Sequence, residues 1–223
     1  MKIGIIVNLY PKSLNEPIVS GETKNPFYLS QALRKLGHTI FVVSHNDYKG
    51  SWKFNDVFVF SVGGEVLKGA LRSLERNLKE VTFFSKFLNI QEVDVINSHI
   101  MTTSFSLILK RKAKHLEIPI ITTAHGTQIP ELYANIIEGH PLYSIAKLNG
   151  LIQYYIDRFS YNNSDRVISV SRYQVKEMIE IYQVPRNKIR VIYNGVDTSF
   201  YLSLIHISEP TRPLYISYAV FCL

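Results

Sequence analysis

The sequence predicts an α/β fold, a Rossmann-like parallel sheet with helices on both faces. Short β-branched runs that are apolar along nearly their whole length alternate with longer segments of helical period, a pattern typical of parallel sheets buried on both faces. No internal repeat or Gly/Ser-rich linker interrupts this alternation before Tyr201, which favours one domain. The predicted strands are Lys2–Val7, Thr39–Ser44, Val57–Phe60, Asp94–Asn97, Pro119–Ala124, Arg166–Val170 and Ile189–Tyr193.

The first helix is predicted over Phe27–Leu36. Gly37 fits the end of this helix, because a helix often closes on a glycine in the left-handed conformation. His38 is then expected at the helix terminus, where the negative end of the dipole favours it, rather than in catalysis. The apolar face expected for this helix consists of Leu29, Ala32, Leu33 and Leu36.

Composition indicates an ordinary globular protein, with 46% hydrophobic and 19% charged residues over 223 residues. The net charge of +7 suits nucleic acid, anionic lipid or phosphorylated substrates equally. No named nucleic-acid-binding motif is present, so we expect no nucleic-acid partner. The single cysteine, Cys222, cannot form a disulfide within the chain. No stretch of about 18 apolar residues occurs, so a cytoplasmic protein is expected.

Histidines follow two neighbouring predicted strands. His99 comes directly after Asp94–Asn97 and Ser98, and His125-Gly126-Thr127 follows Pro119–Ala124. Carboxyl ends of parallel strands meet where open sheets bind ligands, so both imidazoles are expected in one cleft. For His99, direct contact with a ligand and a supporting position behind the cleft stay open as alternatives. A metal site is not predicted, because no third ligand falls at metal spacing.

Ser20-Gly21 precedes the first helix, where a glycine lets backbone N–H groups approach an anion. An ordinary turn is an equal alternative. Neither G-x-G-x-x-G nor the P-loop pattern is present, so NAD and ATP sites are not predicted. Ser171 is predicted to cap a helix that begins with Arg172, and no G-x-S-x-G elbow surrounds it. The apolar face of that helix would be Val175, Met178, Ile179 and Tyr182.

Residues 66–88 form an amphipathic basic helix pattern, with leucines on one face and Lys68, Arg72, Arg76, Lys79 and Lys86 among the polar positions. A crossover helix that packs on the sheet is favoured. Peripheral contact with the inner membrane face is the alternative.

Three stretches together resemble a known family: Leu36 to Ile40, the His125-Gly126 pair, and the run from Asp165-Arg166-Val167-Ile168 to Val191-Ile192-Tyr193-Asn194-Gly195-Val196-Asp197. They resemble the first domain of family 4-like retaining glycosyltransferases, which join two Rossmann-like domains in a GT-B fold. The resemblance covers nearly all of residues 1–201. It implies an acceptor-side domain of an enzyme that moves a sugar from a nucleotide-sugar to a glycan or lipid-linked acceptor.

For the site, the resemblance implies that His125 is catalytic and that no metal or other cofactor is needed. It implies substrate-binding roles for Ser20, Gly21, His99, Gly126, Thr127, Ser171 and Arg172. Ser20 stands where the family usually has a first glycine, and Glu131 follows the His-Gly pair later than the family's usual carboxylate. In the family, a basic pair and a Glu-x7-Glu element in the second domain grip the donor. This sequence has no such domain, so the fragment is expected to be inactive.

Two rivals stay open: a non-catalytic ligand-binding or partner module on the same fold, and a nucleotide-sugar epimerase of the same architecture. Residues 202–223 break the family pattern and resemble the conceptual translation of a transposase-type sequencing adapter. They are therefore expected to be a non-native tail outside the fold.

Overall fold

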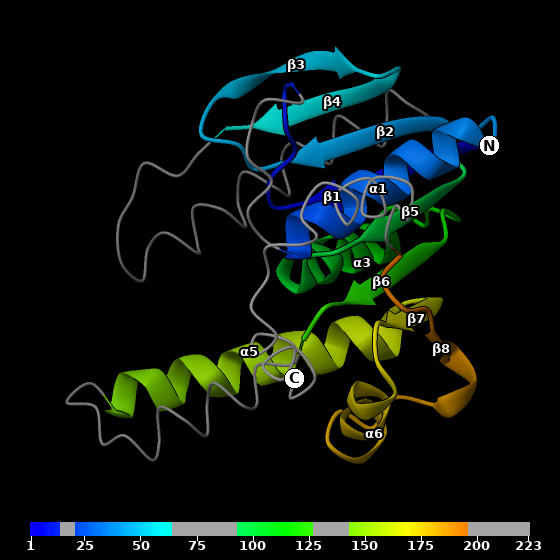
Figure 1. Cartoon of the computed structure of the whole chain (residues 1–223). Coiled ribbons are helices and arrows are strands. Elements are labelled where there is room, and N and C mark those ends of the chain that lie inside the picture. The colour runs from blue at the N-terminus through cyan, green and yellow to red at the C-terminus, as the bar shows by residue number, and fades with distance from the viewer. Residues whose placement is uncertain (14–20, 64–92, 127–142, 196–223) are drawn as a thin grey trace, which may run out of the picture.

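The computed structural model describes residues 1–13, 21–63, 93–126 and 143–195 (Figure 1). These residues form an eight-stranded sheet in the order β3-β4-β2-β1-β5-β6-β7-β8. The strands are β1 Lys2–Val7, β2 Thr39–Ser44, β3 Lys49–Phe54, β4 Val57–Val62, β5 Val95–Ser98, β6 Ile120–Ala124, β7 Arg166–Ser169 and β8 Ile189–Val191. The helices are α1 Gly21–Lys35, α3 Met101–Ala113, α5 Tyr143–Asn163 and α6 Arg172–Glu180, with a 3₁₀ turn, η1, at Arg186–Lys188.

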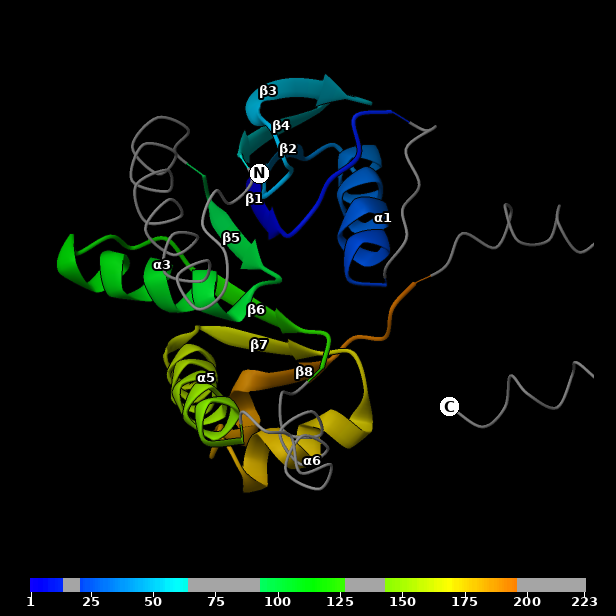
Figure 2. The same ribbon diagram turned by 90° about the vertical axis from the view of Figure 1, so that its left-hand side faces the viewer.

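The sheet is parallel throughout except for the pairing of β3 with β4. Helix α1 lies on one side of the sheet, and α3 and α5 lie on the other (Figure 2). The predicted fold class, a Rossmann-like sheet with helices on both faces, is confirmed. Parallel strands enter and leave by crossover connections, so their carboxyl ends all reach the same edge.

Hydrophobic side chains fill both sides of the central strands. On the α1 side, Ile5 and Val42 are buried in one cluster with Phe27. On the opposite side, Ile6 and Val43 belong to a second cluster that includes residues of α3. Alternate residues of one strand therefore face two cores, which explains why these strands read as continuous apolar runs.

A third hydrophobic cluster supports the far half of the sheet. It joins Val167 of β7 to Tyr161 of α5 and to Met178 of α6. Of the apolar face predicted for α6, Val175, Met178 and Tyr182 are buried, whereas Ile179 is 37% exposed. This cluster packs α6 against the sheet beside β7.

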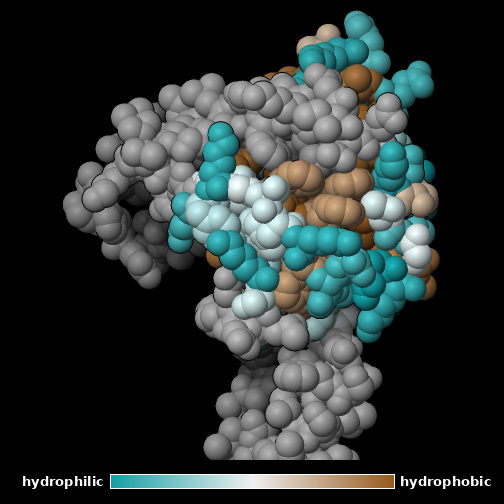
Figure 3. Space-filling view, turned by 90° about the horizontal axis from the view of Figure 1, so that it is seen from above, coloured by the Kyte–Doolittle hydropathy of each residue, from teal (hydrophilic) through white to brown (hydrophobic). Residues whose placement is uncertain are grey.

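Strand β3 was not predicted from the sequence. It forms an antiparallel hairpin with β4 across a turn at Asn55 and Asp56, both with positive φ (46° and 61°). Its residues Lys49 and Lys53 are exposed, so no apolar run marks it. Seen from above, where β3 and β4 lie, hydrophobic surface is bordered by hydrophilic surface (Figure 3). Lysines on such an edge strand oppose pairing with other chains.

Helix α1 begins at Gly21, six residues before the predicted start, and it contains Pro26. A proline usually ends or interrupts a helix, which explains the misplaced start. The predicted apolar face was right only in part: Leu33 packs against the core, but Leu36 is 72% exposed and the buried side carries Phe27 and Ser30. The predicted helix end is confirmed: Gly37 has φ +86°, and the His38 N–H donates to the Leu33 carbonyl at 3.2 Å.

The remaining strand limits differ from the prediction by one or two residues, as strand ends commonly do. Ser20, Thr127, Glu131, the basic segment 66–88 and the tail 202–223 lie outside the described residues. In the part of the chain that the structure describes, no helix is long and apolar enough to cross a membrane.

Candidate functional site

The two predicted histidines meet at the carboxyl edge of the sheet. β5 pairs with β6 in parallel, with Ser98 opposite Thr122, so the residues that follow these strands are neighbours. The Nδ1 atom of His99 lies 2.7 Å from the Nε2 atom of His125, within hydrogen-bonding distance. The two imidazoles therefore meet at the expected edge, but of the two only His99 lines the groove described below.

The two imidazole rings lie edge to edge in nearly one plane. Their centroids are 5.0 Å apart and their planes differ by 21°. With 2.7 Å between the two nitrogens, the centroid distance is reached only if both nitrogens lie close to the line joining the ring centres. The contact is therefore an in-plane hydrogen bond between ring nitrogens, not a face-to-face stack.

His99 is the inner member of the pair. Its Nε2 atom is buried, with no hydrogen-bond partner among the described residues. Burial, and secondarily the nearby His125, lower the pKa of His99 to about 3. Desolvation disfavours the charged imidazolium, so His99 is neutral at physiological pH.

Hydrogen bonds from the adjacent strands hold His99 in place. Its backbone N–H donates to the Ile6 carbonyl of β1 at 2.9 Å. The Ser98 hydroxyl donates to the Ile100 carbonyl at 3.0 Å, which fixes the turn after β5. Next to it, the Thr123 hydroxyl donates to the Asn97 side-chain oxygen at 2.8 Å, linking β6 to β5. The imidazole is thus attached to a rigid part of the sheet.

The loop after β1 forms a neighbouring part of the same edge. The Asn46 side chain holds the backbone of this loop with two hydrogen bonds: it accepts from the Tyr10 N–H at 3.3 Å and donates to the Tyr10 carbonyl at 2.9 Å. The buried Tyr10 hydroxyl lies 2.7 Å from the Ser30 hydroxyl of α1. The ammonium of Lys12 lies 3.2 Å from the centre of the Tyr48 ring, a cation–π contact.

The other predicted site residues lie at the same edge or outside the described ranges. The Ser171 hydroxyl accepts a hydrogen bond from the Gln174 N–H at 3.2 Å, so its predicted capping of α6 is confirmed. Arg172 is exposed in the first turn of α6. Gly126 is exposed, and an added Cβ there would meet no described atom within 4 Å. Gly21 is the first residue of α1.

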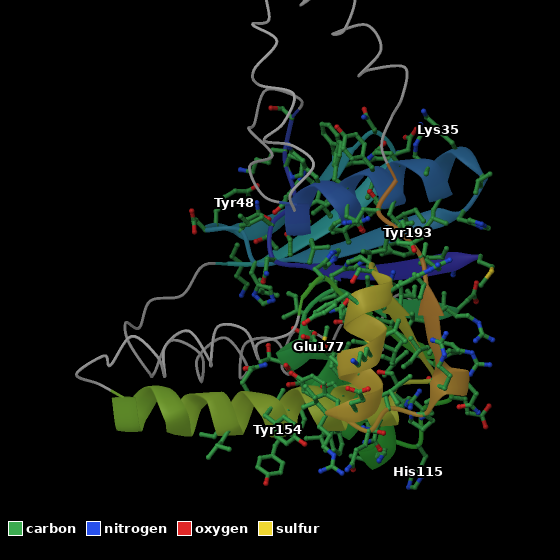
Figure 4. The ribbon with its side chains drawn as sticks, turned by 60° about the horizontal axis from the view of Figure 1, so that its bottom comes forward. Lys35, Tyr48, His115, Tyr154, Glu177 and Tyr193 are labelled. Carbon is green, nitrogen blue, oxygen red and sulfur yellow. The ribbon has the colours of Figure 1, made fainter. Side chains whose placement is uncertain are left out.

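A groove of about 860 Å³ runs between α1 and the sheet, and His99 lies at its wall. Its floor is mainly apolar, and its polar wall residues near the pair are Asn97 and Thr123. The segment after β8 closes it on another side, where the Asn25 side-chain amide donates to the Asn194 side-chain oxygen at 2.7 Å. In Figure 4 this segment, labelled at Tyr193, rises from β8 toward α1, whose end is labelled at Lys35.

Sequence reasoning missed this groove. Its strand residues are Ile3, Val95, Asn97, Ile121, Thr123, Ile168 and Val170, which face the α1 side at alternate positions. Asn97 and Thr123 are polar, whereas the other groove-lining residues of their strands, Val95 and Ile121, are apolar, and this is the signal that could have marked them. The described residues contain no cluster of three His, Cys, Asp or Glu side chains able to hold a metal ion.

Comparison with known proteins places the fold. A curated relative, an uncharacterized glycosyltransferase of Methanocaldococcus jannaschii, is 27% identical over 206 residues, which cover 88% of this chain and 47% of the relative. This chain thus spans about half the length of the curated relative it matches. Solved structures with the same fold include sucrose-phosphate synthase of Thermosynechococcus elongatus, with a TM-score of 0.65 and 11% identity over 94% of this chain and 53% of that chain.

A second solved structure is that of Anabaena HepE in complex with UDP and glucose. It has a TM-score of 0.57 and 16% identity, covering 90% of this chain and 46% of that chain. Identities this low establish the fold alone, a Rossmann-like domain of the GT-B type. The sequence model of Glycosyltransferase Family 4 matches residues 26–200, most of the chain. The chain therefore belongs to Glycosyltransferase Family 4.

Proposed function

We propose that this chain is the acceptor-side domain of a retaining glycosyltransferase that moves a sugar from a nucleotide-sugar to a hydroxyl group of a glycan or lipid-linked acceptor. Family membership supports the transferase activity. The fold is shared with HepE, whose structure contains UDP and glucose. This similarity supports a nucleotide-sugar as the donor.

The observation that carries the proposal is the His99–His125 pair at the carboxyl edge of the sheet, 2.7 Å apart. His125 follows β6 directly and precedes Gly126, where an added side chain would meet no described atom within 4 Å. Sugar transfer places negative charge on the departing diphosphate, and a fixed hydrogen-bond donor aimed at that charge lowers the barrier. His125 is the residue proposed to supply that donor, either to the diphosphate or to the transferring sugar.

The remaining roles follow from the same placement. Gly21 at the start of α1, with Ser20 before it, would let backbone N–H groups line the path of the donor phosphates. Arg172 is exposed at the start of α6 and could face the same phosphates as a cation. Gly126 and Thr127 would contact the substrate beside His125. Ser171 caps α6 whether or not it also contacts substrate.

Transfer requires that donor and acceptor be held together in a closed, water-poor cleft. In two-domain enzymes of this type, the second domain supplies the nucleotide pocket. Half of such a cleft does not position both substrates. We therefore propose that the 223-residue chain is inactive by itself, and that activity belongs to a longer protein in which a donor-binding domain follows.

Two matched titrations test this proposal. Calorimetry with a panel of UDP-, GDP- and ADP-sugars should detect no binding to the present chain and clear binding to the full-length protein obtained from the source genome. The full-length protein should then transfer the sugar, and NMR of the product should show the same anomeric configuration as the donor. Epimerised nucleotide-sugar without transfer would support the epimerase instead, and full-length protein that neither binds nor transfers would support a non-catalytic module.

A further inference from the structure

The hydrogen bond between His99 and His125 contains one proton. A neutral imidazole carries its single N–H on either Nδ1 or Nε2, so one ring must donate and the other must accept. Either His99 Nδ1–H donates to His125 Nε2, or His125 Nε2–H donates to His99 Nδ1. The 2.7 Å separation of the nitrogens fits both arrangements, so the choice rests on the other nitrogen of each ring.

The surroundings of His99 Nε2 distinguish the two arrangements. If His99 accepts the bond at Nδ1, its own proton sits on Nε2, which is buried and has no partner among the described residues. If His99 donates from Nδ1, its Nε2 carries only a lone pair. Buried donors without an acceptor are rarer in native proteins than acceptors without a donor, so the second arrangement is favoured.

The charged form of His99 does not rescue the first arrangement. An imidazolium would place an N–H on both nitrogens and would still leave Nε2–H unpartnered. Burial also holds the pKa of His99 near 3, so His99 carries no extra proton at neutral pH. The buried, unpartnered Nε2 atom and the lowered pKa thus both leave His99 neutral, with its proton on Nδ1.

We propose that His99 is a positioning residue whose Nδ1–H group donates a hydrogen bond to His125 Nε2. This hydrogen bond holds His125 as the Nδ1–H tautomer. With Nε2 accepting from His99, the neutral His125 ring must carry its own proton on Nδ1. The outer histidine is thus fixed as a hydrogen-bond donor on its Nδ1 side. This tautomer is defined by the fold alone and is present before any substrate binds.

The functional meaning of this tautomer rests on the proposed function. A donor at His125 Nδ1 suits a ligand that offers acceptor oxygens, such as a sugar hydroxyl or a diphosphate group. It does not suit a role for that nitrogen as a base that removes a proton from the acceptor hydroxyl. His99 would therefore affect catalysis only through His125, by fixing which ring nitrogen of His125 carries the proton.

Nitrogen NMR of the 223-residue chain tests the tautomer directly. The chain labelled with ¹⁵N-histidine is examined at about pH 8, above the ordinary pKa of an imidazole, by a long-range ¹H–¹⁵N correlation experiment that separates protonated from bare ring nitrogens. We expect the His125 Nδ1 signal to be that of a protonated nitrogen and its Nε2 signal that of a bare one. A protonated Nε2 on His125 would overturn the proposal, with no variant needed.

Two substitutions then test whether His99 sets the tautomer. In His99→Asn, the side-chain amide can take the place of Nδ1–H, so His125 should keep its proton on Nδ1. In His99→Phe the donor is lost, so His125 should shift to mainly Nε2–H, the form that an unconstrained histidine side chain prefers. His115→Asn, at an exposed position with φ 50°, is the matched control and should leave the His125 signals unchanged.

Thermal melting of each variant shows whether it is folded. A folded His99→Phe variant that keeps Nδ1–H on His125 would refute the role of His99. If His99→Phe does not fold, His99→Asn carries the test, because loss of the Nδ1–H form in that folded variant would also contradict the proposal. These spectra are recorded without substrate, so failure of the proposed transferase activity would leave their result intact.

Discussion

The Arg111 guanidinium and the Asp165 carboxylate form an ion pair that joins the last turn of α3 to the residue before β7. The same carboxylate accepts a hydrogen bond from the Ile120 N–H at 2.7 Å, at the start of β6. In return, the Asp165 N–H donates to the Ile120 carbonyl at 2.9 Å. One side chain therefore fixes the amino ends of two neighbouring strands, whose carboxyl ends lead to His125 and Ser171.

We predict that Asp165→Asn lowers the free energy of unfolding by about 1 kcal/mol. Hydrogen bonds to a charged group contribute more than this when buried, but the Asp165 side chain is 45% exposed and solvent weakens the ion pair. Urea unfolding measures the change. The matched control is Asp56→Asn, which removes exposed ion pairs with Lys53 and Arg34 and should cause no measurable change. Equal effects of the two substitutions would contradict the structural role of Asp165.

The Asp157 carboxyl group is a second stability determinant, buried in α5 with 1% exposure. Gln153 donates to it at 2.7 Å, and Tyr154, labelled in Figure 4, stacks on Tyr182 nearby with ring centres 5.4 Å apart. Burial raises the pKa of Asp157 to about 6, and the hydrogen bond from Gln153 opposes this rise only in part. The folded state thus binds this proton more tightly than the unfolded chain does.

We predict that Asp157→Asn stabilises the protein at neutral pH. Because the folded-state pKa is raised, the charged carboxylate reduces the free energy of unfolding as pH rises from about 4 to about 6, and the reduction persists above that range. Asparagine carries no charge, so it removes the cost of burying the Asp157 carboxylate, which is up to about 3 kcal/mol. Melting temperatures should differ most at about pH 7.5 and converge by about pH 4. A difference that is independent of pH would show that Asp157 is charged at little cost.

The fold was largely predictable from the sequence, because parallel strands buried on both faces leave a strong apolar signal. β1 and β2 were predicted with the limits they have. β3 was not predicted, because it is an edge strand that pairs on one side only and is mostly exposed. Its residues, among them Lys49, Gly50 and Lys53, therefore form no apolar run. The start of α1 was misplaced for a different reason: Pro26 is tolerated there by the surrounding structure, which local preferences do not describe.

The candidate site was predictable in part. The positions of His99 and His125 follow from the rule that parallel strands end at one edge, and the cap formed by Ser171 follows from its place before an apolar helical pattern. The direct bond between the two rings depends on side-chain geometry that spacing does not encode. One side of the groove beside α1 is closed by the hydrogen bond between Asn25 and Asn194, which are 169 residues apart in sequence, and no local pattern relates them.

His99 should also make the protein sensitive to acid. Its pKa is lowered to about 3 by burial and by His125, so the stability that its neutral form contributes is complete above the ordinary pKa of 6.5 and is lost as pH falls toward 3. Asparagine does not titrate in this range. We predict that the free energy of unfolding of the unmodified chain, relative to His99→Asn, decreases between about pH 6.5 and about pH 4. Parallel pH profiles in denaturant unfolding would contradict the buried neutral state of His99.

Residues 202–223 give a prediction that rests on sequence alone. They break the family pattern, and the match to Glycosyltransferase Family 4 covers residues 26–200. A segment that did not evolve with the domain has no selected contacts with it. We predict that removing residues 202–223 leaves the melting temperature unchanged or raises it. A clear drop in melting temperature would show that the segment belongs to the fold.

The most direct test of the proposed function is the effect of His125→Ala on the full-length enzyme. Steady-state kinetics and a melting curve are measured together, with His115→Ala at an exposed position on the opposite edge as the control. Losing one fixed hydrogen bond to developing charge typically lowers the rate about 10²- to 10³-fold. We predict a loss of that size in kcat for His125→Ala with an unchanged melting temperature, and near-normal kcat for His115→Ala. A stable His125→Ala enzyme with normal turnover would contradict the assignment of His125 as the catalytic residue.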